Sequence, residues 1–233
     1  MNQRFLYLLL DLFTILFPFL FSFYTPANFS KKWKYLWIAI LIPGIIFVIW
    51  DEIFTRLGVW GFNPQYLSGI YIGNLPLEEI LFFICIPYAC VFTYEALNYL
   101  IKKDLLLAYA KTISVALILG STLLGIFNFE KWYTAVTFLA LALYIFLLQF
   151  VWRVQYLGRF YLSFLFILVP FFIVNGILTG SWIDEPVVWY HDDENLGVRM
   201  GTIPVEDVFY GMLLLLMNVS VFEGLQRKQL SDL

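Results

Sequence analysis

The feature that most constrains this chain is a series of seven apolar runs, each close to 20 residues long. A helix of about 20 apolar residues crosses the hydrocarbon core of a bilayer, and open strands would leave backbone groups unpaired in lipid. Only 13% of the residues are charged. The sequence therefore predicts an all-α integral membrane protein with about seven transmembrane helices. The predicted spans are residues 4–23, 34–50, 76–97, 107–127, 132–151, 160–178 and 204–224.

The Lys and Arg residues predict how these helices are oriented. Four of the 14 lie on the side of the N-terminus, and ten lie on the opposite side. Cytoplasmic loops carry the excess of basic residues, so we expect a multi-pass protein of the cell membrane with its N-terminus outside and its C-terminus in the cytoplasm. The loops 51–75 and 179–203 would both lie outside. Because Asp11 interrupts the first run and KKWK (31–34) follows it, we expect a retained helix and not a cleaved signal peptide.

Several classes of partner and cofactor are not indicated. A net charge of −3 gives no sign of a nucleic-acid partner. His191 is the only histidine, and the common nucleotide-binding and zinc-site motifs are absent, so we expect no metal and no cofactor. Cys85 and Cys90 are five residues apart in one predicted helix, where they cannot pair and are interpreted as small apolar side chains.

The chain contains an internal repeat. A shift of 128 residues places 58–97 on 186–225 without a gap, with eight identities in 40 positions. We predict a first three-helix repeat at 1–101, a spacer helix at 102–130 and a second repeat at 131–233. A repeat with an odd number of helices needs one further membrane-crossing helix between its copies if both copies are to have the same orientation. The result is a parallel repeat. The equivalent segments are then expected to face each other across a pseudo-twofold axis. The identical pairs are Val59/Val187, Gly69/Gly197, Gly73/Gly201, Pro76/Pro204, Glu78/Glu206, Val91/Val219, Glu95/Glu223 and Leu97/Leu225.

Each copy carries a proline and two adjacent carboxylates ahead of an apolar run, in LPLEEILFF (75–83) and IPVEDVFYG (203–211). One interpretation is structural, because the first turn of a helix tolerates proline and its dipole favours carboxylates. The other is chemical. Acids at membrane depth usually line a cavity or pathway, and apolar surroundings with a second carboxyl nearby favour a protonated group, which is a Brønsted acid. Both interpretations stay open. The four acids are Glu78, Glu79, Glu206 and Asp207.

Aromatic side chains near the motifs fit the chemical interpretation. Phe82 and Tyr210 are equivalent in the repeat and lie one helical turn past the first carboxylate of each motif. Aromatic faces stabilise cations, although rings that only pack would show the same pattern. Trp60 and Tyr66 belong to an aromatic stretch that either folds back as a lid or anchors the chain at the membrane interface.

Charged and polar residues outside the motifs are interpreted separately. Arg199 is the one positive charge close to the second motif, and we expect it to pair with Glu206 or Asp207 and to make that group a base. Glu95 and Glu223 lie about 25 Å further along their helices at 1.5 Å per residue, which favours a boundary or helix-pairing role. Further polar groups in or beside the spans are Asp11, Asp51 and Asn175.

The segments GNLPLEEILFFICIPYACVFTYE (73–95) and RMGTIPVEDVFYGMLLLLMNVSVFE (199–223) resemble the membrane-embedded lycopene cyclases of the heterodimeric type. In that family two homologous small membrane domains occur as separate subunits or fused in one chain. This sequence resembles the fused form over its whole length.

The resemblance implies a substrate and a reaction. The substrate would be lycopene, a linear apolar polyene that stays among the membrane lipids. A proton adds to its terminal double bond, an internal double bond attacks the cation, and a proton leaves to give a β-ring, with no obligatory redox change and no metal or cofactor. The resemblance implies acid or base roles for Glu78, Glu79, Glu206 and Asp207. It implies cation stabilisation for Phe82 and Tyr210. From their places in the sequence we also assign Trp60, Tyr66 and Arg199 to the substrate pocket.

Two other functions fit the residues poorly. A retinal protein needs a lysine in its last helix, and residues 160–226 contain none. A membrane prenyltransferase needs aspartates in two loops to hold Mg²⁺, and HDDEN (191–195) has no partner in the loop 51–75. A proton-coupled transporter and a related carotenoid hydratase remain alternatives. The ring type, the number of ends cyclised, one site or two, and the oligomeric state also stay open.

Overall fold

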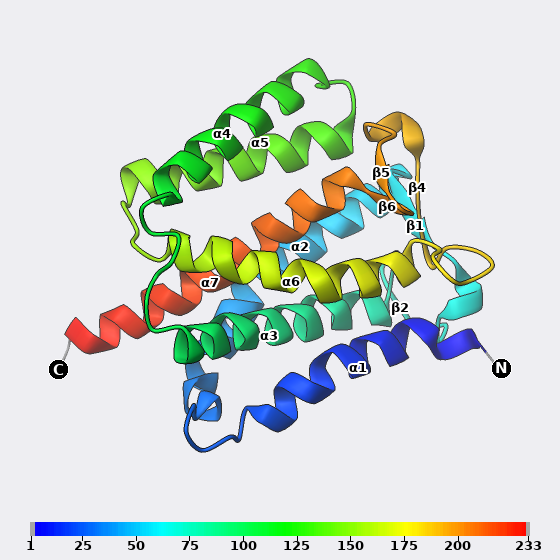
Figure 1. Cartoon of the computed structure of the whole chain (residues 1–233). Helices are drawn as coiled ribbons and strands as arrows, with labels where there is room; N and C mark the ends of the chain where they lie inside the picture. The colour runs from blue at the N-terminus through cyan, green and yellow to red at the C-terminus, as the bar shows by residue number, and fades with distance from the viewer. Residues whose placement is uncertain (1–2, 232–233) are drawn as a thin grey trace. The chain divides into compact units, whose positions relative to one another are not determined.

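The computed structural model describes residues 3–231, and within that range it confirms the prediction of seven membrane-spanning helices (Figure 1). Residues 1–2 and 232–233, which complete the two predicted repeats, lie outside the described residues. The chain is thus a multi-pass, mainly helical membrane protein. Its helices are α1 (Leu6–Phe21), α2 (Trp33–Leu57), α3 (Leu77–Leu100), α4 (Ala110–Phe127), α5 (Trp132–Phe146), α6 (Leu157–Leu178) and α7 (Val205–Ser231).

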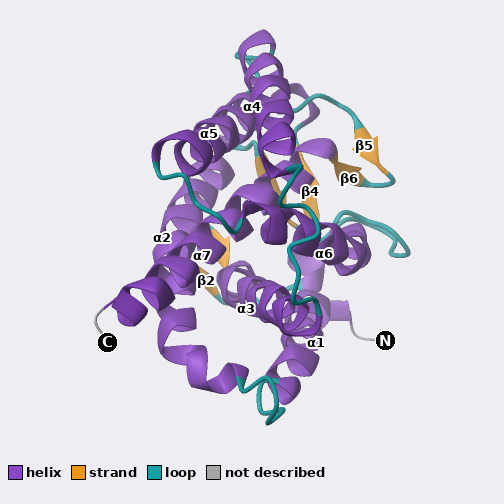
Figure 2. Cartoon of the chain, turned by 60° about the vertical axis from the view of Figure 1, so that its left-hand side comes forward, coloured by secondary structure: helices purple, strands orange, loops and turns teal. Residues whose placement is uncertain are grey.

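Strands are short and belong to the two long loops (Figure 2). Short 3-10 turns lie at Gln3–Phe5, Phe29–Lys32, Pro64–Tyr66 and Asp192–Glu194, and a π-helical turn at Leu147–Val151 extends α5. The strands are β1 (Trp60–Phe62), β2 (Tyr71–Ile72), β3 (Leu75–Pro76), β4 (Val188–Tyr190), β5 (Arg199–Met200) and β6 (Ile203–Pro204).

Helix α2 is longer than the hydropathy of the sequence predicted. The apolar run ends near residue 50, but the helix continues to Leu57 because DEIFTRL contains no helix breaker. Gly58 then ends it in the left-handed region, with φ of 77°, and its amide bonds back to the carbonyls of Phe54 and Thr55. The helical extension carries Asp51 and Glu52, which hydropathy alone assigned to a loop.

The chain forms two compact units, which are described separately. Unit 1 comprises the described residues up to Leu100 together with those from Leu214 on, and unit 2 comprises Ile101–Leu213. In unit 1, α3 packs against α1 and α2, and in unit 2, α4 packs along α5. This division follows packing and not sequence similarity, so the predicted borders of the three-helix repeats stay a prediction.

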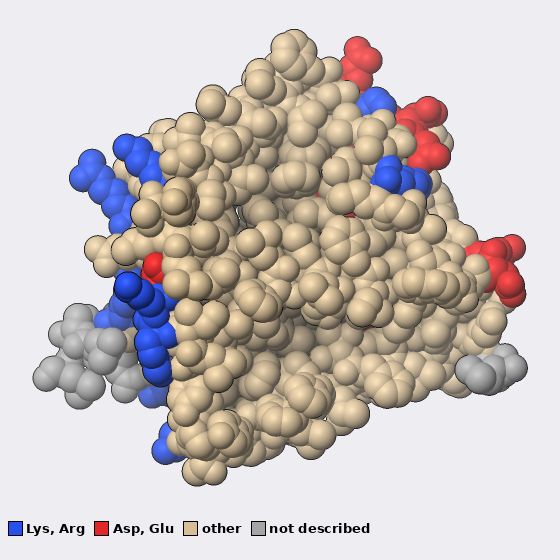
Figure 3. All heavy atoms as spheres, viewed as in Figure 1, with Lys and Arg blue, Asp and Glu red and all other residues tan. Residues whose placement is uncertain are grey.

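Each unit has an apolar core, and apolar side chains also point outward. Large exposed side chains run along α1, where Phe13 is 69% and Phe17 is 63% exposed. The face drawn in Figure 3 has broad areas without charged side chains, as expected for helices that meet lipid. Buried core residues include Leu36, Phe47, Phe83, Tyr88 and Phe222 in unit 1, and Phe138, Leu141, Ile145 and Phe160 in unit 2.

Candidate active site

Both carboxylate motifs lie in the first turn of a helix, directly after a two-stranded hairpin. In unit 1, β2 and β3 pair antiparallel with Tyr71 opposite Pro76, and α3 begins at Leu77. In unit 2, β5 and β6 pair in the same way with Arg199 opposite Pro204, and α7 begins at Val205. The sequence therefore placed the acids correctly in the first turn of each helix, whereas Pro76 and Pro204 are the last residues of β3 and β6 and directly precede the helices.

The hairpins of the two units have the same backbone geometry. Their turns contain Gly73, with φ of 66°, and Gly201, with φ of 68°. The first amide of α3 bonds to the carbonyl of Ile70 at 2.8 Å, and that of α7 bonds to the carbonyl of Val198 at 3.0 Å. The shift of 128 residues found in the sequence thus also relates the hydrogen bonds of the two loops.

The first carboxylate of each motif is completely buried. Glu78 and Glu206 are both 0% exposed. Oε1 of Glu78 accepts a hydrogen bond from the Ser68 amide at 2.6 Å. Oε1 of Glu206 accepts one from the Leu196 amide at 2.8 Å and another from the Thr134 hydroxyl at 2.7 Å. Oε2 of both residues is buried and has no hydrogen-bond partner among the described residues. A buried polar oxygen without a partner is unfavourable, and in a native protein it often marks a functional site.

The second carboxylate of each motif is held by a tyrosine from another helix of the same unit. The hydroxyl of Tyr7 on α1 donates to Glu79 at 2.5 Å, and that of Tyr133 on α5 donates to Asp207 at 2.6 Å. Glu79 is 8% and Asp207 is 4% exposed. The two units therefore repeat the same arrangement of one carboxylate on a loop amide and the next on a tyrosine hydroxyl.

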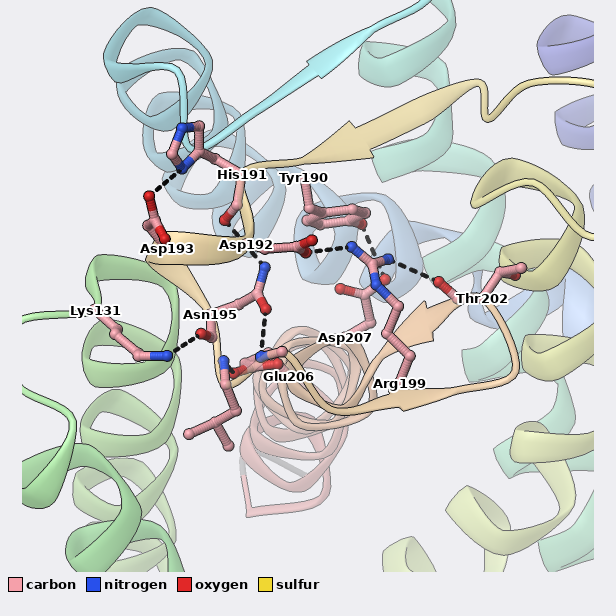
Figure 4. A network of polar contacts seen from close by, with 12 residues as sticks. Lys131, Tyr190, His191, Asp192, Asp193, Asn195, Arg199, Thr202, Glu206 and Asp207 are labelled. Atoms are coloured by element: carbon pink, nitrogen blue, oxygen red, sulfur yellow. Dashed lines mark hydrogen bonds and ion pairs between the residues drawn. The ribbon is translucent and has the colours of Figure 1, made fainter.

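In unit 2 the second carboxylate has two further donors. The Tyr190 hydroxyl lies 2.9 Å and the Asn175 side-chain nitrogen 3.0 Å from Oδ2 of Asp207. Figure 4 shows Tyr190 and Asp207 close together, with Glu206 beside the loop that contains Asn195. The polar residue Asn175, which the sequence analysis noted in a span, thus belongs to this site.

The aromatic residues expected near the motifs lie there. The ring of Phe82 packs edge-on against Tyr7 with centroids 6.3 Å apart, and the ring of Tyr210 packs in the same way against Tyr133 at 6.1 Å. Tyr133 also stacks on Tyr190 at 5.8 Å. Each tyrosine that holds a carboxylate therefore also contacts the aromatic residue predicted one turn further along the motif helix.

Trp60 and Tyr66 are buried, at 5% and 0% exposure. The indole nitrogen of Trp60 donates a hydrogen bond to Asp51 on α2. A ring that anchors a chain at the membrane interface lies at the surface, so the burial of both residues favours an internal role. Whether they form a lid over a substrate stays a prediction.

Arg199 does not form the ion pair that the sequence analysis expected. It donates to Asp192 at 2.7 Å and to the Thr202 carbonyl at 2.8 Å (Figure 4), and not to Glu206 or Asp207. The reason is local, since Asp192 and Arg199 belong to one loop whose turns bring them together. The hydrogen bond from Arg199 holds the pKa of the Asp192 carboxyl below its usual range.

Glu95 and Glu223 connect helices within unit 1, as the helix-pairing interpretation predicted. Lys32, at the start of α2, pairs with Glu95 on α3. Tyr94 of α3 donates to Glu223 of α7 at 2.6 Å. Both residues lie toward the far ends of the motif helices and stay outside the candidate site.

Sequence reasoning missed the donors that hold the carboxylates. Tyr7, Tyr133 and Thr134 lie on α1 and α5, far from the motifs in the sequence. One signal was present: Tyr7 and Tyr133 occupy corresponding places near the starts of the first and fifth apolar runs, at an offset of 126 residues that the gapless shift of 128 did not align. Within residues 3–231, no group of three or more His, Cys, Asp and Glu side chains has an arrangement that would hold a metal ion.

The family described as lycopene cyclase matches residues 4–97 and 130–225. The two matched segments contain the two carboxylate motifs with the tyrosines that hold them. No curated protein and no solved structure matches the chain.

Proposed function

Because the chain belongs to the lycopene cyclase family, we propose that it closes the linear ends of lycopene to β-rings by acid catalysis, as an intramolecular lyase of the cell membrane. Family membership itself establishes an enzyme of carotenoid biosynthesis that cyclises lycopene, a lipophilic substrate. The β-ring, the acid mechanism and the residues that carry it are the parts we add.

The reaction requires a proton and an environment that protects a carbocation. A proton adds to the terminal double bond of lycopene, an internal double bond attacks the cation, and loss of a proton gives the ring. Atoms and electrons balance, because one proton enters and one leaves. A carboxyl group serves as the acid if it is kept away from water close to the polyene.

The observation that carries the proposal is the buried, unpartnered Oε2 atom of Glu78 and of Glu206. In each residue Oε1 is fixed by a loop amide, so Oε2 is the oxygen left to hold or receive a proton. The helix dipole accounts for an acid in the first turn, but it does not account for an oxygen that is removed from water without a partner.

The remaining site residues take supporting roles in this proposal. Glu79 and Asp207 lie next to the first carboxylates and act as acid or base with them. Phe82 and Tyr210 present rings beside each motif, where aromatic faces stabilise the cation. Trp60 and Tyr66 contribute buried aromatic surface, and Arg199 shapes the second loop through Asp192.

The test is to express the chain in cells that accumulate lycopene and to separate the pigments by chromatography, beside Glu78→Gln and Glu206→Gln. Glutamine has the same shape and keeps an oxygen for the loop amide, but it cannot donate a carboxyl proton. We expect γ- or β-carotene from the wild type and a loss of conversion of about 100-fold or more in the variants.

Glu95→Gln is the matched control, because it removes a carboxylate from α3 outside the site, and we expect it to convert lycopene. Conversion that survives both motif substitutions would return the motif acids to a structural role. An inserted wild-type protein that leaves lycopene unchanged would contradict the proposed reaction and favour the transporter or an enzyme of another carotenoid. A hydroxylated lycopene would favour the hydratase.

A further inference from the structure

The hydrogen bonds of the two units show which residues of α1 and α5 correspond. Tyr7 and Tyr133 make the same bond to the second carboxylate, so residues of α1 correspond to residues of α5 that are 126 positions later. Asp11 then corresponds to Thr137. Both are buried, at 1% and 0% exposure, and each has a side-chain oxygen without a hydrogen-bond partner in the described part of the chain.

Helix α2 of unit 1 and helix α6 of unit 2 also contribute one polar residue each near the second carboxylate. Asn175 on α6 donates to Asp207. Asp51 on α2 lies within electrostatic range of Glu79, and Oδ1 of Asp51 accepts the hydrogen bond from Trp60. Unit 1 thus adds the carboxyl groups of Asp11 and Asp51 around its motif, where the side chains on α5 and α6 of unit 2, Thr137 and Asn175, are neutral.

As a result, the two sites differ in charge although their frame is the same. Unit 1 buries four carboxyl groups, Asp11, Asp51, Glu78 and Glu79, which are 1%, 2%, 0% and 8% exposed. Asp11 lies within electrostatic range of both motif acids. Among the described residues, neither Asp11 nor Asp51 nor Glu78 forms an ion pair. We name these four residues the acidic cluster.

Unit 2 buries only two carboxyl groups and surrounds them with donors. Thr134 and the Leu196 amide bond to Glu206, while three side chains bond to Asp207: Tyr133, Tyr190 and Asn175. Arg199 lies within electrostatic range of Asp207 as well. Donors of this kind stabilise a carboxylate in its ionised form.

The two sites differ in how unfavourable it is to ionise all of their carboxyl groups at once. Four negative charges that are close together and removed from water would be very unfavourable. Carboxyl groups in such a cluster share protons, which belong to the cluster and not to one residue. The acidic cluster is therefore a store of protons, whereas unit 2 buries only two carboxyl groups and provides more hydrogen-bond donors to them.

We propose that unit 1 supplies the proton for cyclisation, and that Asp11 and Asp51 are positioning residues that keep this proton on the Glu78–Glu79 motif. This inference rests on the proposed function. A carboxyl of the cluster gives its proton to the terminal double bond and becomes a carboxylate. The cyclised cation releases a proton, and the cluster regains one from that release or from water, so each turnover leaves the cluster as it began.

Asp51→Asn and Asp11→Asn test the inference in the full-length protein. The asparagine that replaces Asp51 keeps an oxygen that accepts from Trp60, and Asn175 shows that the site in unit 2 accepts an asparagine beside its second carboxylate. We expect both variants to lower kcat roughly tenfold or more at unchanged KM for lycopene in liposomes, since neither Asp11 nor Asp51 need contact the polyene. Ser114→Ala, which removes another buried hydroxyl, is the control and should keep wild-type kinetics.

An infrared measurement supplies a readout that does not depend on activity. A protonated carboxyl group has a carbonyl stretch that an ionised one lacks. We expect this band in the purified wild type at neutral pH, a weaker band in the two Asp variants, and a smaller change in Glu206→Gln.

Asp variants with wild-type kinetics and an unchanged infrared band would overturn the inference and leave the proposed function standing. A band that is lost equally in Glu206→Gln would also overturn it. An inactive wild type would overturn the proposed function instead, and the infrared comparison would still decide which unit stores the protons.

Discussion

At the scale of single residues, a tyrosine hydroxyl holds the second carboxylate in each unit. A tyrosine donates a hydrogen bond without adding a positive charge, so it fixes the position of Glu79 or Asp207 and favours the ionised carboxylate less strongly than a cation does. Such a partner suits an acid–base site better than an arginine would, because a guanidinium would hold the carboxylate in its ionised form.

Tyr7→Phe and Tyr133→Phe are predicted to weaken cyclisation, because each removes the hydrogen bond that fixes a motif carboxylate. Loss of such a bond should also reduce stability by about 1–3 kcal/mol. Tyr94→Phe is the matched control: it removes a tyrosine bond to Glu223 at the other end of α3, and it should reduce stability but keep conversion. Pigment chromatography and thermal unfolding measure the two effects. Equal conversion by all three variants would argue against a catalytic role for the tyrosine contacts.

At the scale of the elements, the two hairpins place the motifs at the helix starts, and their glycines permit the turns. Gly73 and Gly201 have nearly the same backbone conformation, but their surroundings differ. A Cβ atom added at Gly73 would lie 3.0 Å from the carboxylate of Glu52, whereas one at Gly201 would meet nothing within 4 Å. Glu52 also accepts bonds from the amide and side chain of Asn74, so it connects α2 to the first hairpin.

Gly73→Ala is therefore predicted to destabilise the protein more than Gly201→Ala. Both place a side chain in the left-handed region, at roughly 1–2 kcal/mol, and Gly73→Ala also displaces Glu52 from the hairpin. Gly224→Ala in α7, where nothing lies within 4 Å of the new Cβ, is the control and should be neutral or stabilising, since alanine is the better helix former. The order of the three melting temperatures checks the prediction, and equal losses at Gly73 and Gly201 would contradict the role of Glu52.

The ion pair in the second loop predicts a weak dependence of stability on pH. The pKa of Asp192 is lowered in the folded protein by Arg199, so the pair stabilises the fold above the unfolded value of about 3.9, and this contribution is lost as pH falls through the lower folded value. Because the Asp192 side chain is 69% exposed, the effect should stay below about 1 kcal/mol.

Asp192→Asn should therefore lower the melting temperature slightly at pH 7 and match the wild type in strong acid. The substitution keeps the bond from Arg199 to the Thr202 carbonyl, so the comparison isolates the ion pair. A difference between the two proteins that persists in acid would mean that Asp192 contributes by a route other than its charge.

At the scale of the whole molecule, hydropathy and local signals predicted the helices and the place of the motifs, because chain length in lipid and first-turn chemistry are properties of short segments. The gapless shift of 128 residues also relates the loop amides that bond to Glu78 and Glu206, although the bonds themselves were not predicted. Contacts between helices were harder to predict. A run that is apolar on all sides does not show which face is buried, so the places of Tyr7, Asp11 and Thr137 emerged only from packing.

The orientation of the molecule is the remaining prediction from the sequence, and it decides where the proton comes from. With Cys85→Ala and Cys90→Ala as background, Asp184→Cys and Lys103→Cys place one thiol on each of two exposed loops. The distribution of Lys and Arg predicts that a membrane-impermeant thiol reagent labels the thiol at position 184 in intact cells, and the thiol at position 103 only after permeabilisation. The motif hairpin at 199–204 lies on the same loop as residue 184. Labelling in this pattern would mean that protons reach the hairpin side from outside the cell, and the reverse pattern would assign that supply to the cytoplasm.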